Sequence, residues 1–250
     1  SLAKFYNDIK FENINKFIYL FFPFLILATP FFFVVIQPDL GTSLSILILG
    51  VFILFLVGIR LWKFIFGFVV TFISIPIFLQ FIKPYQRDRI VSFLNPESDP
   101  LGQGYQLIQS KIALGSGGFT GKGFLQGTQS YLEYLPEKQT DFIFTLIGEE
   151  FGFLGTIFII FLFILIISVC YFISIKCFHI YGRILALGVG SNIFIYVFMN
   201  IAMVSGLMPV VGIPLPLISY GGSVMLSIMI SIGLVLNVEL NYNLKKLNNA

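Results

Sequence analysis

Six long apolar stretches restrict what this sequence can fold into. Hydrophobic residues make up 57% of the chain and charged residues only 11%, whereas a soluble domain carries about 25% charged residues. Crossing the hydrocarbon core of a bilayer takes roughly 17 to 25 helical residues, and each stretch has a length in that range. The predicted membrane spans are residues 17–36, 42–59, 64–82, 151–175, 184–208 and 224–240.

The predicted fold is an all-α, polytopic integral membrane bundle of about six transmembrane helices. Helices are favoured over a membrane β-barrel because the stretches are continuously apolar rather than alternating. Residues 1–250 are expected to form a single membrane domain. The net charge of +3 comes from basic residues beside the spans and therefore does not indicate nucleic-acid binding.

The positions of Lys and Arg predict the orientation, because short cytoplasmic connections carry an excess of them. Basic residues precede the first span and occupy the second connection, the fourth connection and the C-terminal tail: Lys4, Lys10, Lys16, Arg60, Lys63, Lys176, Arg183, Lys245 and Lys246. The first and fifth connections have none. Both termini are therefore predicted to be cytoplasmic, and residues 83–141 to form one large extracytoplasmic (periplasmic) loop.

Asp141 is a carboxylate at the threshold of an apolar run. It follows the polar stretch 135–140 and directly precedes Phe142, Ile143 and Phe144. A charge at the mouth of a hydrophobic segment is costly unless it faces a polar cavity, so this position predicts a functional residue.

The glycine-rich stretch 115–123 has two interpretations. A P-loop is excluded, because it would need Gly at 116 and Ser or Thr at 123, where the chain has Ser116 and Gly123. Successive backbone N–H groups, with Lys111 and Lys122 nearby, could still hold another phosphate. A tight surface turn with glycines at positive φ is at least as well supported by the spacing.

Four other features carry structural expectations. Asp39 is expected to cap the helix that follows it, although a carboxylate between two spans could also be functional. Residues 209–223 contain three prolines and three glycines, which predicts non-helical backbone near membrane depth that is buried in protein or lines a cavity. Glu149 and Glu150 are interpreted as first-turn acids of the next helix. A helix with Tyr105, Ile108 and Ile112 on one face is expected along the membrane surface.

Hydrolytic sites built on histidine or cysteine are excluded. His179 is the only histidine, and Cys170 and Cys177 are spaced as two helix turns, so the chain lacks a zinc ligand set. His179 is also predicted to lie across the membrane from the long loop, which excludes a Ser-His-Asp triad there.

Several motifs together resemble the SEDS family of cell-wall polymerases. They lie at residues 37–42, 96–100, 109–113, 127–130, 135–144 and 209–223, in the family's order over nearly the whole chain. Pro-Glu-Ser-Asp-Pro and Ser-Lys-Ile-Ala-Leu-Gly-Ser-Gly-Gly are closer to the elongation type, RodA, than to the division type, FtsW. The family usually has ten membrane segments, so the first four are expected to be missing from this chain.

The resemblance implies a peptidoglycan glycosyltransferase that polymerises lipid II into glycan strands for cell-wall elongation and rod shape. It places the family's essential aspartate at Asp141, as the base that removes a proton from the acceptor sugar hydroxyl. Because the leaving group is a lipid diphosphate, cationic side chains are expected to bind it. The substrate-binding candidates are Arg87, Arg89, Lys111, Glu137, Ser219 and Tyr220. No cofactor is required for certain, and a divalent cation held partly by Asp141 or Glu137 stays open.

The resemblance also implies a location and partners. The location is the bacterial inner membrane, and the partners are lipid II, membrane lipids, a class B penicillin-binding protein and the elongation machinery. A transporter (flippase) of lipid-linked precursor is the alternative, because polar breaks at membrane depth also suit transport. A non-catalytic scaffold is the third hypothesis.

Overall fold

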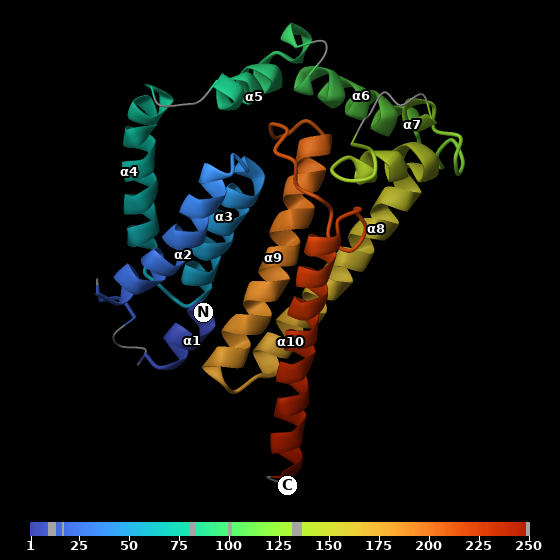
Figure 1. Cartoon of the computed structure of the whole chain (residues 1–250). Helices are drawn as coiled ribbons and strands as arrows, with labels where there is room; N and C mark the ends of the chain where they lie inside the picture. The colour runs from blue at the N-terminus through green and yellow to red at the C-terminus, as the bar shows by residue number, and fades with distance from the viewer. Residues whose placement is uncertain (10–13, 17, 81–83, 100–101, 132–136, 249–250) are drawn as a thin grey trace. The chain divides into compact units, whose positions relative to one another are not determined.

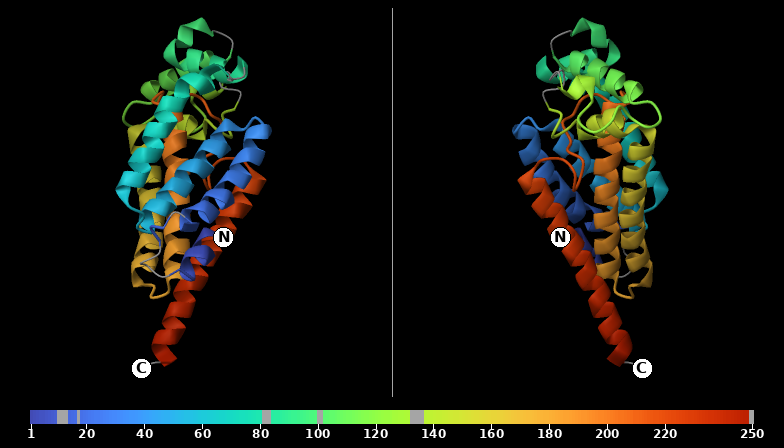
Figure 2. Two further views of the ribbon diagram at one scale, coloured as in Figure 1. Left: turned by 90° about the vertical axis from the view of Figure 1, so that its left-hand side faces the viewer. Right: turned by 90° about the vertical axis from the view of Figure 1, so that its right-hand side faces the viewer.

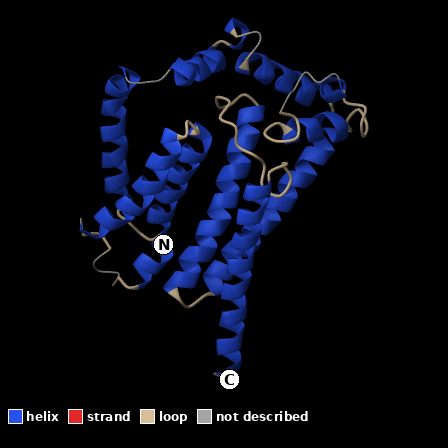
Figure 3. Ribbon diagram, viewed as in Figure 1, coloured by secondary structure: helices blue, strands red, loops and turns tan. Residues whose placement is uncertain are grey.

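The chain folds into helices joined by loops and turns in the part that the structure describes (Figure 3). The structure, a computed structural model, describes residues 1–9, 14–16, 18–80, 84–99, 102–131 and 137–248. It contains no strand within these residues, which confirms the all-α prediction. The helices are α1 (Leu2–Asn7), α2 (Ile18–Ile36), α3 (Leu40–Leu56), α4 (Leu61–Gln80), α5 (Pro84–Leu94), the 3-10 helix η2 (Pro96–Ser98), α6 (Gln103–Ser116), α7 (Thr128–Tyr131), α8 (Ile143–Lys176), α9 (Ile180–Val204) and α10 (Gly222–Asn248).

Each predicted span overlaps a helix, although the second and fifth were predicted to extend beyond the ends of α3 at Leu56 and α9 at Val204. In the described part, four helices are long and apolar enough to cross a membrane, namely α2, α8, α9 and α10. The apolar helices Leu40–Leu56 and Leu61–Pro76 are shorter. The chain is therefore a multi-pass membrane protein, and the sixfold crossing stays a prediction. Ile82 and Lys83, where the third predicted span meets the long loop, lie outside the described residues.

Two compact units share the chain, and several helices pass from one unit into the other. The first unit comprises Ser1–Phe78, Leu165–Ile195 and Ser227–Ala250, and the second comprises Leu79–Ile164 and Tyr196–Leu226. The colour bar of Figure 1 gives the residue numbers by which these segments can be found. The candidate functional residues all belong to the second unit.

In the first unit, α2 and α3 lie side by side as a helical hairpin (Figures 1 and 2). The Asp39 side chain caps α3 by accepting a hydrogen bond from the Thr42 backbone N–H at 3.0 Å, which confirms the predicted cap. The helices approach closely at Gly50, where an added Cβ would meet the Leu27 side chain. A core cluster of this unit consists of Tyr6, Ile14, Val57, Ile59 and Ile184.

In the second unit, α6 packs on α5, η2 and α7. Its buried face carries Leu107, Ser110 and Ala113, whereas Ile112, on the face predicted to meet the membrane surface, is exposed. The helix itself is confirmed, and its lying along the membrane stays a prediction.

Asp99 links the N-terminus of α6 to α5. Its Oδ2 accepts hydrogen bonds from the Gly104 backbone N–H at 3.3 Å and from Ser92 Oγ at 3.1 Å. Hydrogen bonding, first of all from the Gly104 N–H, lowers the pKa of the Asp99 carboxyl below its usual value, although partial burial opposes this. The carboxylate therefore stabilises the helix N-terminus in its charged form.

Helix α8 begins earlier than its apolar run and is broken at Gly152, where φ is 64° and ψ is −158°. The predicted span 151–175 matches the part beyond the break. Glu149 and Glu150 precede the break and are buried, so their interpretation as first-turn acids is wrong. The physical reason is that a turn at residues 137–142 leads directly into the helix at Ile143.

Candidate active site

Asp141 lies in the turn that leads into α8. The backbone N–H groups of Thr140 and Phe142 both donate to the Glu137 carbonyl at 3.2 Å. Glu137 Oε2 also accepts a hydrogen bond from Thr140 Oγ1 at 2.7 Å. Glu137 thus stabilises the turn, and the turn leaves Asp141 half-buried beside the fully buried Phe142.

The non-helical segment 205–221 pairs with the residues just before Asp141. Its irregular backbone confirms the non-helical prediction for 209–221, whereas Gly222 and Ser223 begin α10 and the membrane depth stays a prediction. Ser219 Oγ donates to the Thr140 carbonyl at 2.6 Å and accepts from the Leu215 N–H at 2.7 Å. The Tyr220 N–H donates to the Gln139 carbonyl at 2.9 Å. The Ser219 hydroxyl proton is therefore committed to the backbone, and Ser219 holds the two segments together.

Asn200 of α9 joins both segments and was missed in the sequence. Its side chain has 0% exposure, and its Nδ2 donates to the carbonyls of Asp141 at 2.8 Å and Ile213 at 2.7 Å. Its buried Oδ1 has no hydrogen-bond partner among the described residues. The available signal was an asparagine inside an apolar run, because polar side chains within membrane helices usually have a specific role.

Gly212 lies directly against the carboxylate of Asp141. Its φ of 72° is in the left-handed region that favours glycine. A Cβ added there would be 3.2 Å from Asp141 Oδ2. The positive φ therefore favours glycine at this position, and a larger residue would also press on the carboxylate.

Ser110 holds α6 against α8 and α9. Its role was also not predicted from the sequence. Its Oγ donates to the Val204 carbonyl at 2.6 Å and lies 3.0 Å from Thr145 Oγ1. Both hydroxyl-bearing side chains are fully buried. The next residue, Lys111, is exposed, and its side chain lies against Gly206 at the start of segment 205–221. The structure thus brings the predicted cation Lys111 to this segment.

The two predicted arginines lie on α5. Arg87 is exposed and Arg89 is half-buried. Arg89 Nη1 is buried without a hydrogen-bond partner among the described residues. The hydrogen bonds described around Asp141 come from other elements, so the roles of Arg87 and Arg89 stay predictions.

An open depression of about 480 Å³ lies beside the turn. Its lining residues come from the turn, the start of α8, segment 205–221 and the start of α10: Gln139, Ile143, Leu217, Ile218, Ser219, Tyr220, Gly221, Gly222 and Met225. Tyr220 is 80% exposed and presents its phenol to solvent. The volume is in the range of ligand-binding clefts, roughly 300 to 1,000 Å³.

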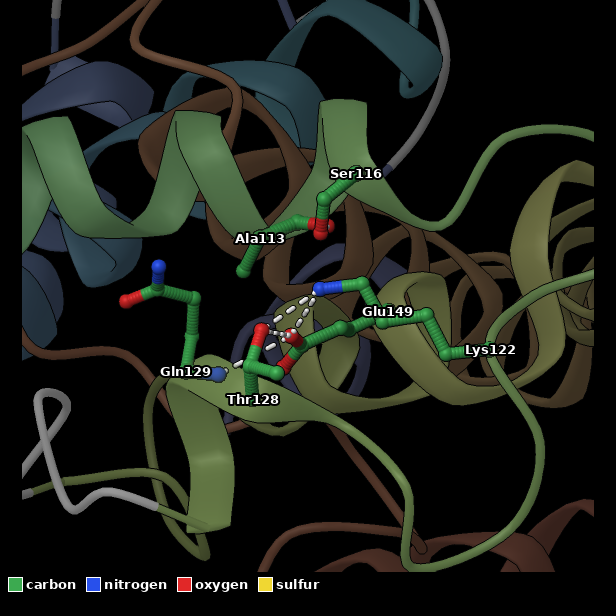
Figure 4. A network of polar contacts seen from close by, with 6 residues as sticks. All are labelled: Ala113, Ser116, Lys122, Thr128, Gln129 and Glu149. Atoms are coloured by element: carbon green, nitrogen blue, oxygen red, sulfur yellow. Dashed lines mark hydrogen bonds and ion pairs between the residues drawn. The ribbon is translucent and has the colours of Figure 1, made fainter.

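Glu149 forms the centre of a second polar network (Figure 4). This carboxylate is 1% exposed, and its Oε1 accepts hydrogen bonds from Lys122 Nζ at 2.8 Å, Thr128 Oγ1 at 3.2 Å and the Gln129 N–H at 2.9 Å. Lys122 Nζ also donates to Thr128 Oγ1 at 2.7 Å. The network fixes the glycine-rich stretch and α7 on α8.

The glycine-rich stretch is a packed turn. Gly118, Gly121 and Gly123 all have positive φ, as the turn interpretation expects. The N–H groups of Lys122 and Gly123 donate to carbonyls of α8, and the Lys122 ammonium is paired with Glu149. These donors are used within the protein, which favours the turn over a phosphate cradle.

Two expectations are not tested by the described residues. Leu135 and Pro136, which open the motif that contains Asp141, lie outside them. In the described part, no group of three or more His, Cys, Asp or Glu side chains could hold a metal ion. A divalent cation held by Asp141 or Glu137 would need further ligands such as substrate phosphates, and it stays a prediction.

Comparison with known proteins decides the family. A family model described as "Cell cycle protein", which covers FtsW, RodA and SpoVE, matches residues 1–244. The chain belongs to the FtsW/RodA/SpoVE family. This is the SEDS family that the motifs resemble, and that prediction is confirmed.

Relatives of this SEDS chain include a peptidoglycan glycosyltransferase. It is 48% identical over 218 residues to the peptidoglycan glycosyltransferase MrdB of Escherichia coli strain K12. That match covers 86% of this chain and 58% of MrdB, so the chain spans little more than half of that relative's length.

Solved structures share the fold. A chain of a peptidoglycan synthase complex that coordinates polymerization and crosslinking superposes with a TM-score of 0.79 at 30% identity, over 96% of this chain and 66% of that one. RodA of Thermus thermophilus superposes with a TM-score of 0.63 at 22% identity, over 96% of this chain and 62% of RodA. The SEDS chain therefore has a known membrane fold.

Proposed function

We propose that this SEDS protein is a peptidoglycan glycosyltransferase that polymerises lipid II for cell-wall elongation and rod shape. The observation that carries the proposal is its 48% identity to MrdB, itself a peptidoglycan glycosyltransferase. The chain spans 58% of MrdB, so the activity is assigned to the natural protein as a whole.

Asp141 is the proposed base. The 4-hydroxyl of one lipid II attacks the anomeric carbon of the growing chain, and the carboxylate of Asp141 takes the hydroxyl proton. The bond from the anomeric carbon to the diphosphate oxygen breaks, and undecaprenyl diphosphate leaves with the electron pair. The half-buried position of Asp141, its hydrogen bond from Asn200 and the contact with Gly212 support this role, because a base must be held in place to act.

The remaining candidates are assigned to substrate binding. The Lys111 ammonium, exposed on α6 next to Gly206, is suited to the charge that develops on the departing diphosphate. We also assign Arg87 and Arg89 to binding of the lipid diphosphate. We assign Ser219, Tyr220 and Glu137 to the sugars of lipid II. Ser219 and Tyr220 line the depression beside the turn.

The location and the partners follow from the same proposal. Lipid II is presented on the outer face of the bacterial inner membrane, so the loop 83–141 lies on that face and both termini are cytoplasmic. A complex that couples polymerization to crosslinking contains a chain of this fold, which supports a crosslinking partner, here a class B penicillin-binding protein. The other proposed partners are the elongation machinery and membrane lipids.

Polymerisation in detergent tests the proposal, because a detergent solution has no bilayer to be crossed. The natural full-length protein is purified and given labelled lipid II, with a preparation from cells lacking the gene as the control. Glycan polymer that forms only with the protein is the expected result. Absence of polymer together with intact flipping of lipid II in vesicles would contradict the proposal and support the transporter.

A further inference from the structure

The glycine-rich turn carries an exposed apolar surface. Within residues 117–126, the side chains of Phe119, Phe124 and Leu125 are 64%, 68% and 71% exposed. The ring of Phe119 packs on Phe153 with centroids 5.8 Å apart, and the ring of Phe124 packs on Phe151 at 6.2 Å. The turn and the outer surface of α8 at its break therefore form one apolar surface.

The backbone of the turn fills the break in α8. Four hydrogen bonds join the two: Phe153 N to Gly118 O (3.0 Å), Leu154 N to Phe119 O (3.2 Å), Lys122 N to Glu149 O (3.0 Å) and Gly123 N to Glu150 O (3.0 Å). A helix break at Gly152 would otherwise leave backbone groups without partners. Such groups are tolerated at membrane depth only when protein satisfies them, so the turn makes the break compatible with a lipid environment.

Charge is also removed from the outer side of the turn. Lys122 is the only charged residue within 117–126. Its ammonium points inward and forms an ion pair with the buried Glu149 at 2.8 Å. The surface that carries Phe119, Phe124 and Leu125 is therefore left without a charged side chain of its own.

Leu125 has a backbone conformation that leucine rarely adopts. Its φ is 60°, in the left-handed region where a Cβ is unfavourable. Its side chain is nevertheless exposed, so packing within the chain does not compensate for this conformation. Strained residues that persist at a surface point to a role there.

We propose that residues 117–126 form a membrane anchor that inserts Phe119, Phe124 and Leu125 among the acyl chains of the leaflet around the break in α8. Acyl chains are the expected occupant because this surface continues onto α8, which is apolar and long enough to cross the membrane. Beyond the break, the exposed apolar residues of α8 include Leu154, Ile157, Phe158, Phe161 and Ile164. The anchor would hold the Glu149 network at the membrane surface.

Tryptophan fluorescence in nanodiscs tests the anchor. In the natural full-length protein every native tryptophan, Trp62 included, is replaced by phenylalanine, so that a tryptophan introduced by Phe124→Trp reports from the turn. Phe119→Trp is the second reporter, and Glu97→Trp on η2, at an exposed charged position, is the control. Each variant is measured in phosphatidylcholine with and without bromine on the acyl chains, and with iodide in the water.

The two reporters in the turn are expected to lose about half of their emission to brominated acyl chains and little to iodide, because their rings lie in lipid. The control is expected to respond to iodide instead. Strong quenching by iodide at both turn positions would overturn the proposal, because it places the surface in water. Quenching by neither probe would also overturn it, because protein would then cover the surface. The readout needs no enzymatic activity and is independent of the proposed function.

Discussion

The side-chain amide of Asn200 donates a 2.8 Å hydrogen bond to the backbone carbonyl of Asp141. The same nitrogen donates to the carbonyl of Ile213 at 2.7 Å, and the side chain is completely buried. One residue of α9 therefore fixes the turn before α8 relative to segment 205–221. The position of the proposed base depends on this amide.

Asn200→Leu removes both hydrogen bonds at similar side-chain volume. The buried carbonyl of Ile213 then loses its donor, at about 1–3 kcal/mol, the part-buried carbonyl of Asp141 loses the same donor at a smaller cost, and the Asp141 backbone is free to shift. Misplacing a catalytic group costs on the order of 100-fold in rate, so we expect polymerisation of lipid II to fall mainly through kcat. Asn192→Leu is the matched control on the same helix. Equal rates for the two variants would refute the positioning role.

Gly212→Ala places a methyl group in tight contact with the Asp141 carboxylate. The added Cβ would be 3.2 Å from Oδ2, and the φ of 72° is unfavourable for alanine, at about 1–2 kcal/mol. We expect slower polymerisation and a lower midpoint of thermal unfolding. Gly115→Ala, at a helical glycine of α6 where an added Cβ meets nothing within 4 Å, should leave the rate unchanged and should not lower the midpoint. An active Gly212→Ala protein would show that the carboxylate does not need this space.

Lys122→Met leaves the Glu149 carboxylate buried without its cation. Breaking a buried pair in this way costs on the order of 3 kcal/mol. The cost is lower here because Lys122 is partly exposed and solvent screens its interaction with Glu149. We expect Lys122→Met to lower the thermal unfolding midpoint in detergent more than Glu149→Gln does, because the neutral amide can still accept from Thr128 and Gln129. The double variant should be more stable than Lys122→Met alone. A double variant with the two costs simply added would exclude coupling between them.

The lowered pKa of Asp99 predicts that the stability of the fold depends on pH in the acidic range. Hydrogen bonds lower the pKa of this carboxyl in the folded chain below its ordinary value of 3.8. The stabilisation is therefore complete above the unfolded pKa and is lost as the pH falls through the folded pKa. We expect Asp99→Asn to lower the unfolding midpoint at about pH 6, and the difference from wild type to close only as the pH falls below 3.8 and through the lower pKa of the folded chain. A difference that stays constant over this range would contradict the assignment to charge.

Local sequence patterns predicted the elements of this fold. Continuous apolar runs indicate membrane helices, Asp39 has the sequence position of an N-cap, and the prolines of 209–223 prevent a helix. Asp141 was identified because a charge beside an apolar run is costly to keep. The start of α8 was missed because hydropathy marks where a span enters lipid, whereas this helix begins at Ile143, before the predicted span 151–175.

Contacts between distant residues were not predictable in the same way. The pairs Asn200–Asp141, Ser110–Thr145 and Lys122–Glu149 are each separated by many residues in sequence, and only the packing of helices brings them together. Composition and spacing along the sequence do not indicate which distant residues come into contact when helices pack. A polar side chain in an apolar run can mark one partner, but it does not identify the other.

The rate of lipid II polymerisation by Asp141→Asn protein tests the central claim most directly. Asparagine keeps the size of the side chain and the backbone carbonyl that Asn200 binds, but it cannot accept the proton. We expect the rate in detergent to fall by about 10²- to 10⁴-fold, while Asp88→Asn, at an exposed carboxylate of α5, keeps the wild-type rate. Polymerisation by Asp141→Asn at the wild-type rate, or normal rod-shaped growth of cells that depend on it, would contradict the account.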